Sequence, residues 1–202
     1  MMVRAFQALT GVLLGLAIVL WFLRPSGIDP SGGQTSYFLP DPFPVPSFEL
    51  LTHQGDVVRS TDFGDRILAV FFGYTSCPDI CPLTLSHLTE VFQEMGEQGE
   101  GIQVLFITVD PARDTPERME RYLGSFHPSF LGLTGTEAES RTVAHGFGAD
   151  FVRNGEGDSY TVDHTARIFI LSPPGRMLLT FPLSATPDEM VRDLSRLLEE
   201  TS

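Results

Sequence analysis

The chain has 202 residues, with 26 acidic and 13 basic side chains and a formal net charge of −13 at pH 7. That length is enough for one well-cored domain with additional segments. The strong negative charge disfavours polyanions, so no nucleic-acid partner is expected.

The N-terminal region predicts a membrane anchor over residues 1–24. No charged side chain occurs from Ala5 to Leu23, and a helix of that length crosses the ~30 Å hydrocarbon core of a bilayer. A cleaved signal peptide is the alternative, but its apolar run is usually shorter and ends in small residues. Here the run ends in the bulky residues Trp21, Phe22 and Leu23, which favours an uncleaved single-pass anchor.

The flanking charges indicate how this anchor is oriented. Arg4 and the terminal amine precede the apolar run and Arg24 follows it, which slightly favours an N-terminus on the inner side. The following domain would then face the oxidising side of the membrane. Because the N-terminal region lacks the Arg-rich and Ser-rich composition of organelle transit peptides, we expect a bacterial inner membrane, with the soluble domain in the periplasm.

Residues 25–46 are rich in Pro, Gly, Ser and Asp, a composition typical of an extended tether. A stretch of about 20 residues spans up to roughly 70 Å when fully extended. The tether would let the domain reach a partner in the same membrane, although a spacer without that role fits equally well.

The remaining residues, 47–202, alternate apolar runs of strand length with amphipathic helical patterns. In chain order we expect a hairpin at 47–59, a strand at 67–72, a helix at 82–98, a strand at 102–109, helices at 114–125 and 137–147, a hairpin at 167–181 and a helix at 186–198. This order predicts an α/β fold of thioredoxin-like type, a mixed sheet flanked by helices.

Cys77 and Cys81 are the only cysteines, and they follow the first core strand directly. Open α/β sheets place their sites at this carboxyl edge. Pro82 suits the first turn of a helix, so both thiols are predicted in a loop that leads into a helix near Pro82. A helix N-terminus lowers a thiol pKa and populates the thiolate, which binds metals and attacks disulfides. A static disulfide is the alternative, although so short a loop yields little entropic stabilisation.

His164 is the candidate third ligand, because it precedes a predicted strand that the fold order places beside the cysteine loop. Two thiolates and one imidazole form a soft set suited to Cu(I), whereas closed zinc sites use four ligands. An ordinary strand histidine is the alternative. The other histidines are expected to be solvated or capping residues: His53, His87, His127 and His145.

Three charged residues near the cysteines have open roles. Asp110 and Arg113 follow the second core strand at the same edge of the sheet. They either orient the cysteine loop or, as we favour, cap the next helix and pair at the surface. Asp79, between the two cysteines, is either a negative charge that favours a cation or a plain loop acid.

Three segments together resemble the Sco/SenC family: Gly73–Pro82, Val109–Pro116 and Val162–Thr165. The resemblance extends over about residues 45–200. It implies a membrane-tethered thioredoxin-like domain that faces the periplasm or the mitochondrial intermembrane space. It also implies one copper ion, as Cu(I) or Cu(II), bound at the positions of Cys77, Cys81 and His164. The family serves the assembly of the dinuclear copper centre of cytochrome c oxidase, and some members act mainly as thiol-disulfide reductases.

Two functions therefore remain open. A metallochaperone would take copper from a periplasmic donor and pass it, by ligand exchange, to the copper-site subunit of cytochrome c oxidase. A thiol-disulfide oxidoreductase would use Cys77 and Cys81 to reduce the cysteines of that subunit. A peroxidase is disfavoured, because the threonine and proline expected ahead of a peroxidatic cysteine are missing. Thr75 precedes Cys77 by only two residues, and no proline lies nearby upstream.

Overall fold

A computed structural model describes residues 36–157, 159–173 and 175–201. The predicted anchor at residues 1–24 lies outside these ranges. Within them, no helix combines the length and the apolar character that spanning a bilayer requires.

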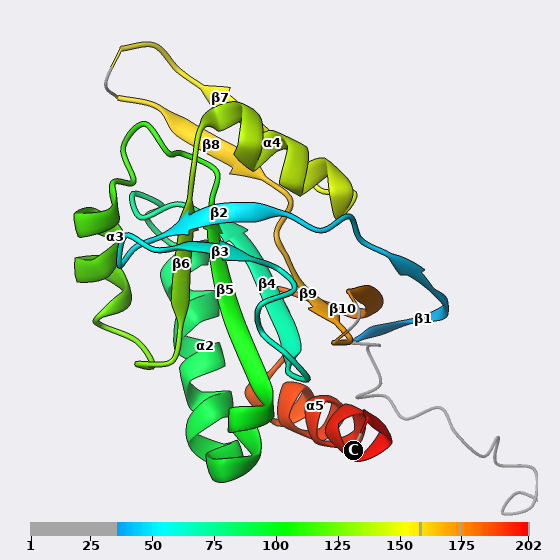
Figure 1. The fold of residues 1–202 in the computed structure, drawn as a ribbon. Helices are drawn as coiled ribbons and strands as arrows, with labels where there is room; N and C mark the ends of the chain where they lie inside the picture. Colours follow the sequence, from blue (N-terminus) through cyan, green and yellow to red (C-terminus); the bar gives the residue numbers. More distant parts are fainter. Residues whose placement is uncertain (1–35, 158, 174, 202) are drawn as a thin grey trace, which may run out of the picture. The chain divides into compact units, whose positions relative to one another are not determined.

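Three parallel strands form the centre of the sheet: β4 (Ile67–Gly73), β5 (Ile102–Thr108) and β6 (Leu131–Thr134). Every residue of β4 and β5 is buried. Nearly continuous apolar runs of this kind, broken in β5 only by Gln103 and Thr108, are typical of parallel strands that are covered on both faces. Both strands therefore form where the apolar runs predict them, and their carboxyl ends meet at one edge of the sheet (Figure 1).

Antiparallel strands extend this centre on both sides. The described strands form an eight-stranded mixed sheet in the order β1-β10-β9-β4-β5-β6-β2-β3. The five added strands are β1 (Tyr37–Pro44), β2 (Glu49–Thr52), β3 (Val57–Arg59), β9 (Arg167–Leu171) and β10 (Arg176–Pro182). The predicted hairpins at 47–59 and 167–181 correspond to β2–β3 and β9–β10.

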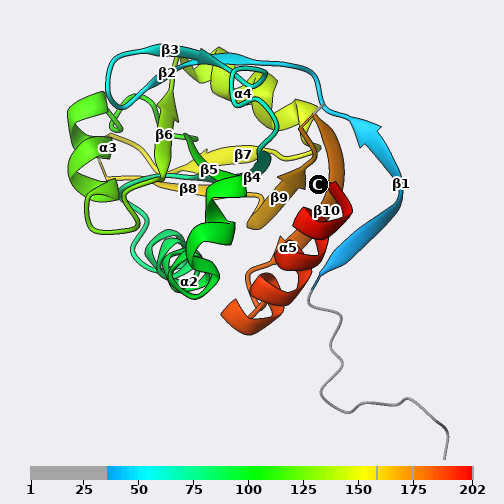
Figure 2. The same ribbon diagram turned by 60° about the horizontal axis from the view of Figure 1, so that its bottom comes forward.

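Strand β1 lies inside the segment 25–46 that its composition assigned to the tether. It pairs with β10 as an edge strand of the sheet (Figure 2). Pro40, Pro42 and Pro44 made this segment look unstructured, but edge strands accept prolines because half of their backbone groups need no partner. The folded part of the chain therefore begins before residue 47.

The helices have these bounds: α2 (Ile80–Met95), a 3₁₀ helix (Gly96–Gly101), α3 (Pro116–Leu123), α4 (Glu137–Gly146) and α5 (Pro187–Thr201). Thr115 caps α3 ahead of Pro116, as predicted, and Thr136 forms a capping box with Glu139 at the start of α4. Helices α2 and α5 lie side by side against one face of the sheet (Figure 2).

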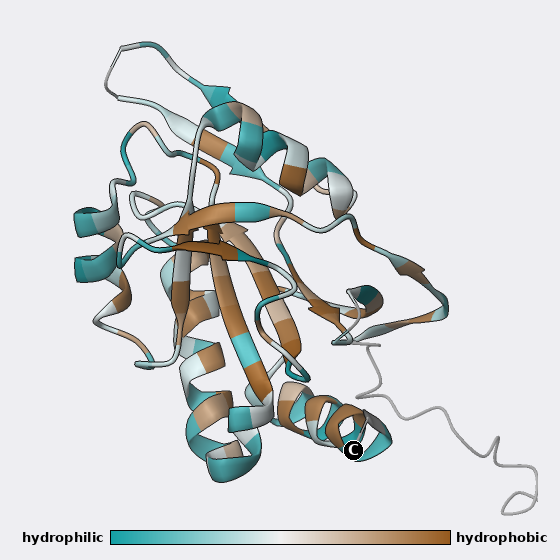
Figure 3. Ribbon diagram, viewed as in Figure 1, coloured by the Kyte–Doolittle hydropathy of each residue, from teal (hydrophilic) through white to brown (hydrophobic). Residues whose placement is uncertain are grey.

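The core is divided by the sheet into two aromatic layers. On one face Phe71 and Phe106 lie with ring centroids 6.0 Å apart, and on the other Phe72 lies 5.3 Å from Phe147, just after α4. The central strands are coloured hydrophobic along most of their length, whereas the helices mix hydrophobic and hydrophilic residues (Figure 3). The segment that follows β4 therefore starts from a strand that is packed on both faces.

Two features of the site region differ from the prediction. Helix α2 begins at Ile80, so Cys81 lies in its first turn and not in the preceding loop. Pro82 is tolerated at the third helical position because the first four N–H groups of a helix have no internal partner. Strands β7 (Phe151–Asn154) and β8 (Thr161–His164) form a separate hairpin that the sequence analysis did not predict.

Candidate metal and thiol site

The cysteine segment begins where β4 ends, at Gly73. A Cβ atom at Gly73 would lie 2.9 Å from the Cys81 Sγ and 2.7 Å from the Phe106 ring. A side chain there would overlap both groups, so this position needs glycine. The close approach places the Cys81 thiol directly over the end of the central strand.

The structure brings Cys81 and His164 together, as the fold order predicted. The Cys81 Sγ lies 3.6 Å from the His164 Nε2, although the two residues are 83 positions apart in the chain. Cys81 is fully buried at the start of α2, and His164 is the last residue of β8. A thiol and an imidazole from separate elements thus face each other.

The two ring nitrogens of His164 have different partners. Its Nδ1 lies 3.3 Å from the Thr165 carbonyl oxygen; since a carbonyl only accepts, Nδ1 carries the proton and Nε2 presents its lone pair to Cys81. The rings of Phe71 and Tyr74 each meet the imidazole edge-on at 6.1 Å. Burial lowers the pKa of His164, outweighing the Thr165 carbonyl and the Asp163 charge, which favours the neutral, metal-binding form.

The two thiols differ in environment. Cys77 is half-buried, and its N–H donates to the Tyr74 carbonyl over 3.2 Å. Burial raises the pKa of Cys77, but the N–H groups of Asp79, Cys81 and Ile80 and the Cys81 thiol together outweigh it, so the pKa is lowered. Burial raises the pKa of Cys81, and the Cys77 charge adds to that rise. The thiolate therefore forms first at Cys77.

The three predicted ligands are not equally placed. Both cysteines are free thiols. Across the described ranges, no three side chains of the His, Cys, Asp and Glu types are grouped closely enough to hold a metal ion as they stand. Cys81 and His164 face each other, and Cys77, four residues earlier, has the Cys81 thiol as a neighbour.

Asp114 anchors the cysteine segment, a role that the sequence did not reveal. Its fully buried carboxylate accepts from the Thr75 N–H at 3.0 Å, from the Thr75 hydroxyl at 2.5 Å and from the Thr108 hydroxyl at 2.7 Å. Burial raises the pKa of Asp114 despite these donors. Arg118 adds a bond of 2.8 Å to the Thr75 hydroxyl. An acid beside a helix cap gave no signal for a partner 39 residues away.

Asp110 and Arg113 pair with each other, as favoured, but not at the surface. Asp110 is only 4% exposed, and the Arg113 side chain is 21% exposed. Both contact Tyr160, the residue just before β8. Asp79, by contrast, is exposed at the N-cap position of α2 and makes no side-chain cap bond.

The other histidines have contacts away from the thiols. The His53 Nδ1 accepts from the Gly132 N–H at 3.0 Å, and the His127 ring packs 5.2 Å from Phe92. The His145 Nε2 lies 3.4 Å from Asp150. His87 lies within α2.

A comparison with protein-family models gives a match to SCO1/SenC over residues 41–199. The chain belongs to the SCO1/SenC family. The family assignment made from the three sequence segments is therefore confirmed.

Individual members of the family agree in sequence and fold. A "SCO2-like protein" of Rickettsia felis is 37% identical over 150 residues, which cover 73% of each chain. The structure of Bradyrhizobium japonicum ScoI with copper bound is 37% identical, with a TM-score of 0.71 over 76% of this chain and 99% of that one. Apo Sco1 from Thermus thermophilus is 39% identical, with a TM-score of 0.74 over 81% and 96%. The mixed thioredoxin-like fold is thus shared with these proteins.

Proposed function

We propose that this chain is a membrane-tethered copper chaperone that binds one copper ion through Cys77, Cys81 and His164. It delivers the ion to the dinuclear copper site of cytochrome c oxidase, or prepares the thiols of that site. The contact of 3.6 Å between the Cys81 Sγ and the His164 Nε2 carries the proposal. The copper-bound relative from Bradyrhizobium japonicum supports copper as the metal.

The chemistry of these three groups suits copper. Thiolate sulfur is a soft ligand that selects Cu(I), and imidazole also binds copper. The lowered pKa of Cys77 makes it the first thiolate available. A bound cation then deprotonates Cys81, whose pKa burial raises in the metal-free protein. Because Cys77 is half-buried, an acceptor thiolate can replace it first and begin the transfer.

Copper titration of the reduced full chain tests this proposal, with X-ray absorption to identify the ligands. We expect one copper per chain, bound by two sulfurs and one nitrogen. Cys77→Ala and Cys81→Ala should each remove a sulfur, and His164→Ala should remove the nitrogen. His127→Ala is the matched control and should bind as the unaltered chain does. Unchanged stoichiometry and affinity in the Cys77 or His164 variant would contradict the assignment.

A thiol-disulfide oxidoreductase is the second candidate, and the opposite pKa shifts of the two thiols favour it. The Cys77 thiolate would attack one sulfur of the target disulfide and release the other as a thiolate. Cys81 would then displace the bound sulfur, leaving Cys77 and Cys81 oxidised and the target reduced. This exchange does not need an imidazole. Rapid reduction of an oxidised oxidase-subunit peptide that persists in His164→Ala would favour this function over copper transfer.

The placement at the membrane completes the proposal. The apolar segment 5–23 would hold the chain in the inner membrane, with the folded domain in the periplasm. A membrane-impermeant thiol reagent applied to intact spheroplasts should then label Cys77. Labelling only after membrane disruption would place the domain on the other side.

A further inference from the structure

Strand β8 carries the predicted imidazole ligand at its last position, and an aromatic residue, Tyr160, directly precedes its first position. Side chains alternate along a strand, so Val162 and His164 point to the same face, and Tyr160 lies two residues before Val162. Val162 is 5% exposed and belongs to the hydrophobic core. At about 3.3 Å per residue, Tyr160 and His164 are roughly 13 Å apart along the backbone. Contacts that fix Tyr160 therefore act on the start of the short backbone segment that carries His164.

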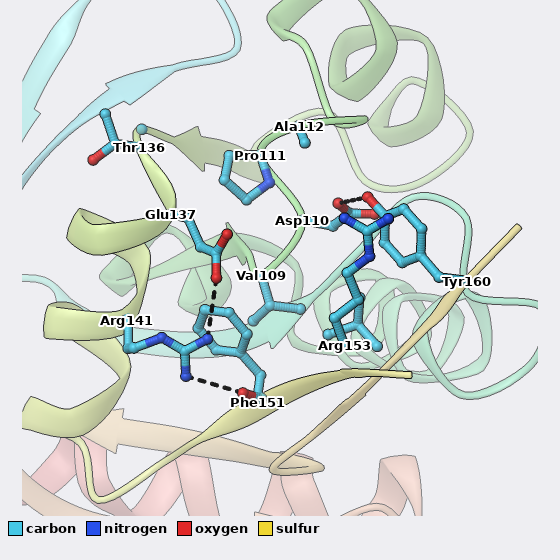
Figure 4. A pocket seen from close by; sticks show the side chains of 12 residues that line it. Val109, Asp110, Pro111, Ala112, Thr136, Glu137, Arg141, Phe151, Arg153 and Tyr160 are labelled. Carbon is cyan, nitrogen blue, oxygen red and sulfur yellow. Dashed lines mark hydrogen bonds and ion pairs between the residues drawn. The ribbon is translucent and has the colours of Figure 1, made fainter. Parts of the chain in front are cut away.

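Tyr160 is held from three sides. The guanidinium carbons of Arg113 and Arg153 lie 3.6 Å and 3.5 Å from the centroid of its ring. Its hydroxyl donates to the Asp110 carboxylate at 2.6 Å, at the wall of a pocket between β8 and the loop after β5 (Figure 4). Arg113 also donates to the Tyr160 carbonyl oxygen over 3.0 Å. Side chain and backbone of this one residue are thus both tied down.

Arg113 connects this cluster to the thiol site. It forms an ion pair with Asp110 and lies 5.8 Å from the centroid of the Tyr74 ring. Tyr74 meets the His164 ring edge-on and belongs to the cysteine segment, three residues before Cys77. Through Arg113, the loop after β5 therefore contacts both Tyr160, just before β8, and Tyr74, which packs against the imidazole.

The large sheet gives the hairpin no strand partner, so other contacts hold it: Arg141 of α4 donates to the Phe151 carbonyl, and the loop after β5 bonds to Tyr160. Strands β7 and β8 pair only with each other in the described part of the chain. At the base of the hairpin, the Thr165 N–H donates to the Asp150 carbonyl at 2.9 Å. Toward its tip, Gly155 and Gly157 adopt positive φ angles of 115° and 66°. Tyr160 is the residue of the hairpin that bonds to the loop after β5 on this tip side.

We propose that Tyr160 is a positioning residue for His164. Its ring, stacked between Arg113 and Arg153 and bonded to Asp110, holds β8 so that the imidazole stays against Cys81. The copper part of this inference rests on the proposed function. The placement of the imidazole does not, and it is measurable without metal.

The test compares variants of the full chain after loading with Cu(II), by electron paramagnetic resonance and by the rate of copper release to a chelator. In Tyr160→Leu, which removes ring and hydroxyl, we expect loss of the nitrogen coupling and about tenfold faster release. Tyr160→Phe keeps the stacked ring and should retain the coupling. Tyr37→Leu is the matched control, because Tyr37 also lies against an arginine, Arg167, on strand β1, and it should behave as the unaltered chain.

Two further measurements distinguish a failure of the positioning role from a failure of the proposed copper function. Amide hydrogen exchange at residues 161–164 of the metal-free chain should be faster in Tyr160→Leu than in Tyr37→Leu. Arg153→Ala, at an exposed residue whose loss should leave the fold intact, should raise exchange and copper release to an intermediate degree. Unchanged nitrogen coupling, release and exchange in the Tyr160 and Arg153 variants would overturn the inference. If the unaltered chain bound no copper, the proposed function would fail, while exchange would still test the placement.

Discussion

At the scale of single residues, the site is built on a difference between two thiols. Cys81 is fully buried at the end of β4, close to Gly73, whereas Cys77 is half-buried. The same short segment thus offers a thiolate that other molecules can reach and a thiol that they cannot. Such a pair suits stepwise exchange of either a metal ion or a disulfide, because one sulfur can be engaged while the other stays protected.

This difference predicts selective alkylation. When the reduced, metal-free chain is treated with iodoacetamide at neutral pH, Cys77 should react faster than Cys81, because it is more exposed and its pKa is lowered. Peptide mass spectrometry over a time course measures both rates. In Cys77→Ser the remaining thiol should stay slow. Equal rates at the two cysteines would show that their environments do not differ in this way.

Burial of His164 predicts a pH dependence of stability. Its pKa in the folded chain is lowered below the ordinary value of 6.5, chiefly by burial. At pH values between the lowered pKa of the folded chain and 6.5, the unfolded chain binds more protons than the folded chain. The free energy of unfolding therefore rises with pH up to about 6.5 and decreases as the pH falls below that value. Denaturant unfolding of the metal-free chain at several pH values measures this.

The matched variant for that measurement is His164→Gln, which cannot titrate. The loss of stability on acidification should be smaller in His164→Gln than in the unaltered chain. His127→Gln serves as a second comparison, because burial lowers the pKa of His127 too and its contribution must be counted separately. Parallel pH curves for the His164 variant and the unaltered chain would mean that the imidazole is solvated.

At the scale of elements, the loop after β5 supports the cysteine segment. Asp114, from that loop, accepts three hydrogen bonds from Thr75 and Thr108. Thr75 lies just before the cysteines. The position of the thiols thus depends on a loop 30 to 40 residues further along the chain. The arrangement is rigid because the accepting carboxylate is fully buried.

Removing this carboxylate should therefore affect both stability and the site. In Asp114→Ala the Thr75 N–H and two hydroxyls lose their acceptor, and each buried donor left unpaired costs about 1–3 kcal/mol. We expect a loss of about 2–4 kcal/mol in the free energy of unfolding, measured by denaturant titration, together with weaker copper binding. Asp114→Asn keeps one oxygen acceptor and should lose less. Equal stability of Asp114→Ala and the unaltered chain would contradict this role.

The sequence predicted those elements whose signal is local. Strand β4 is a continuous apolar run, β5 is apolar apart from Gln103 and Thr108, and α3 starts at the cap that precedes Pro116. The four-residue strands β6, β7 and β8 were missed, because so few residues establish no period by themselves; the similarly short β2 and β3 were predicted only as a hairpin around a turn. The juxtaposition of Cys81 and His164 followed from the fold order. The contacts of Asp114 and Tyr160 did not, because side chains that meet across 39 and 50 residues leave no pattern in the sequence.

At the scale of the whole molecule, the edge strand decides where the folded domain begins. Strand β1 pairs with β10, its Tyr37 lies against Arg167, and the Val45 N–H donates to the Gly175 carbonyl at 2.9 Å. Ser36, just before the strand, donates to Asp193 of α5 at 2.6 Å. These contacts attach the first described residues to the domain, so any tether ends close to residue 36 and not at 46.

Two truncated chains test this boundary. A chain that begins at Ser36 keeps every contact of β1, and its free energy of unfolding should be that of the longer chain's folded domain. A chain that begins at Ser47 loses β1 and the buried Val45. Several backbone hydrogen bonds of about 0.5–1.5 kcal/mol each disappear, so we expect a loss of about 2–4 kcal/mol by denaturant titration. Strand β10 would then become an unprotected edge, which favours aggregation. Equal stability and solubility of the two chains would restore the boundary at residue 47.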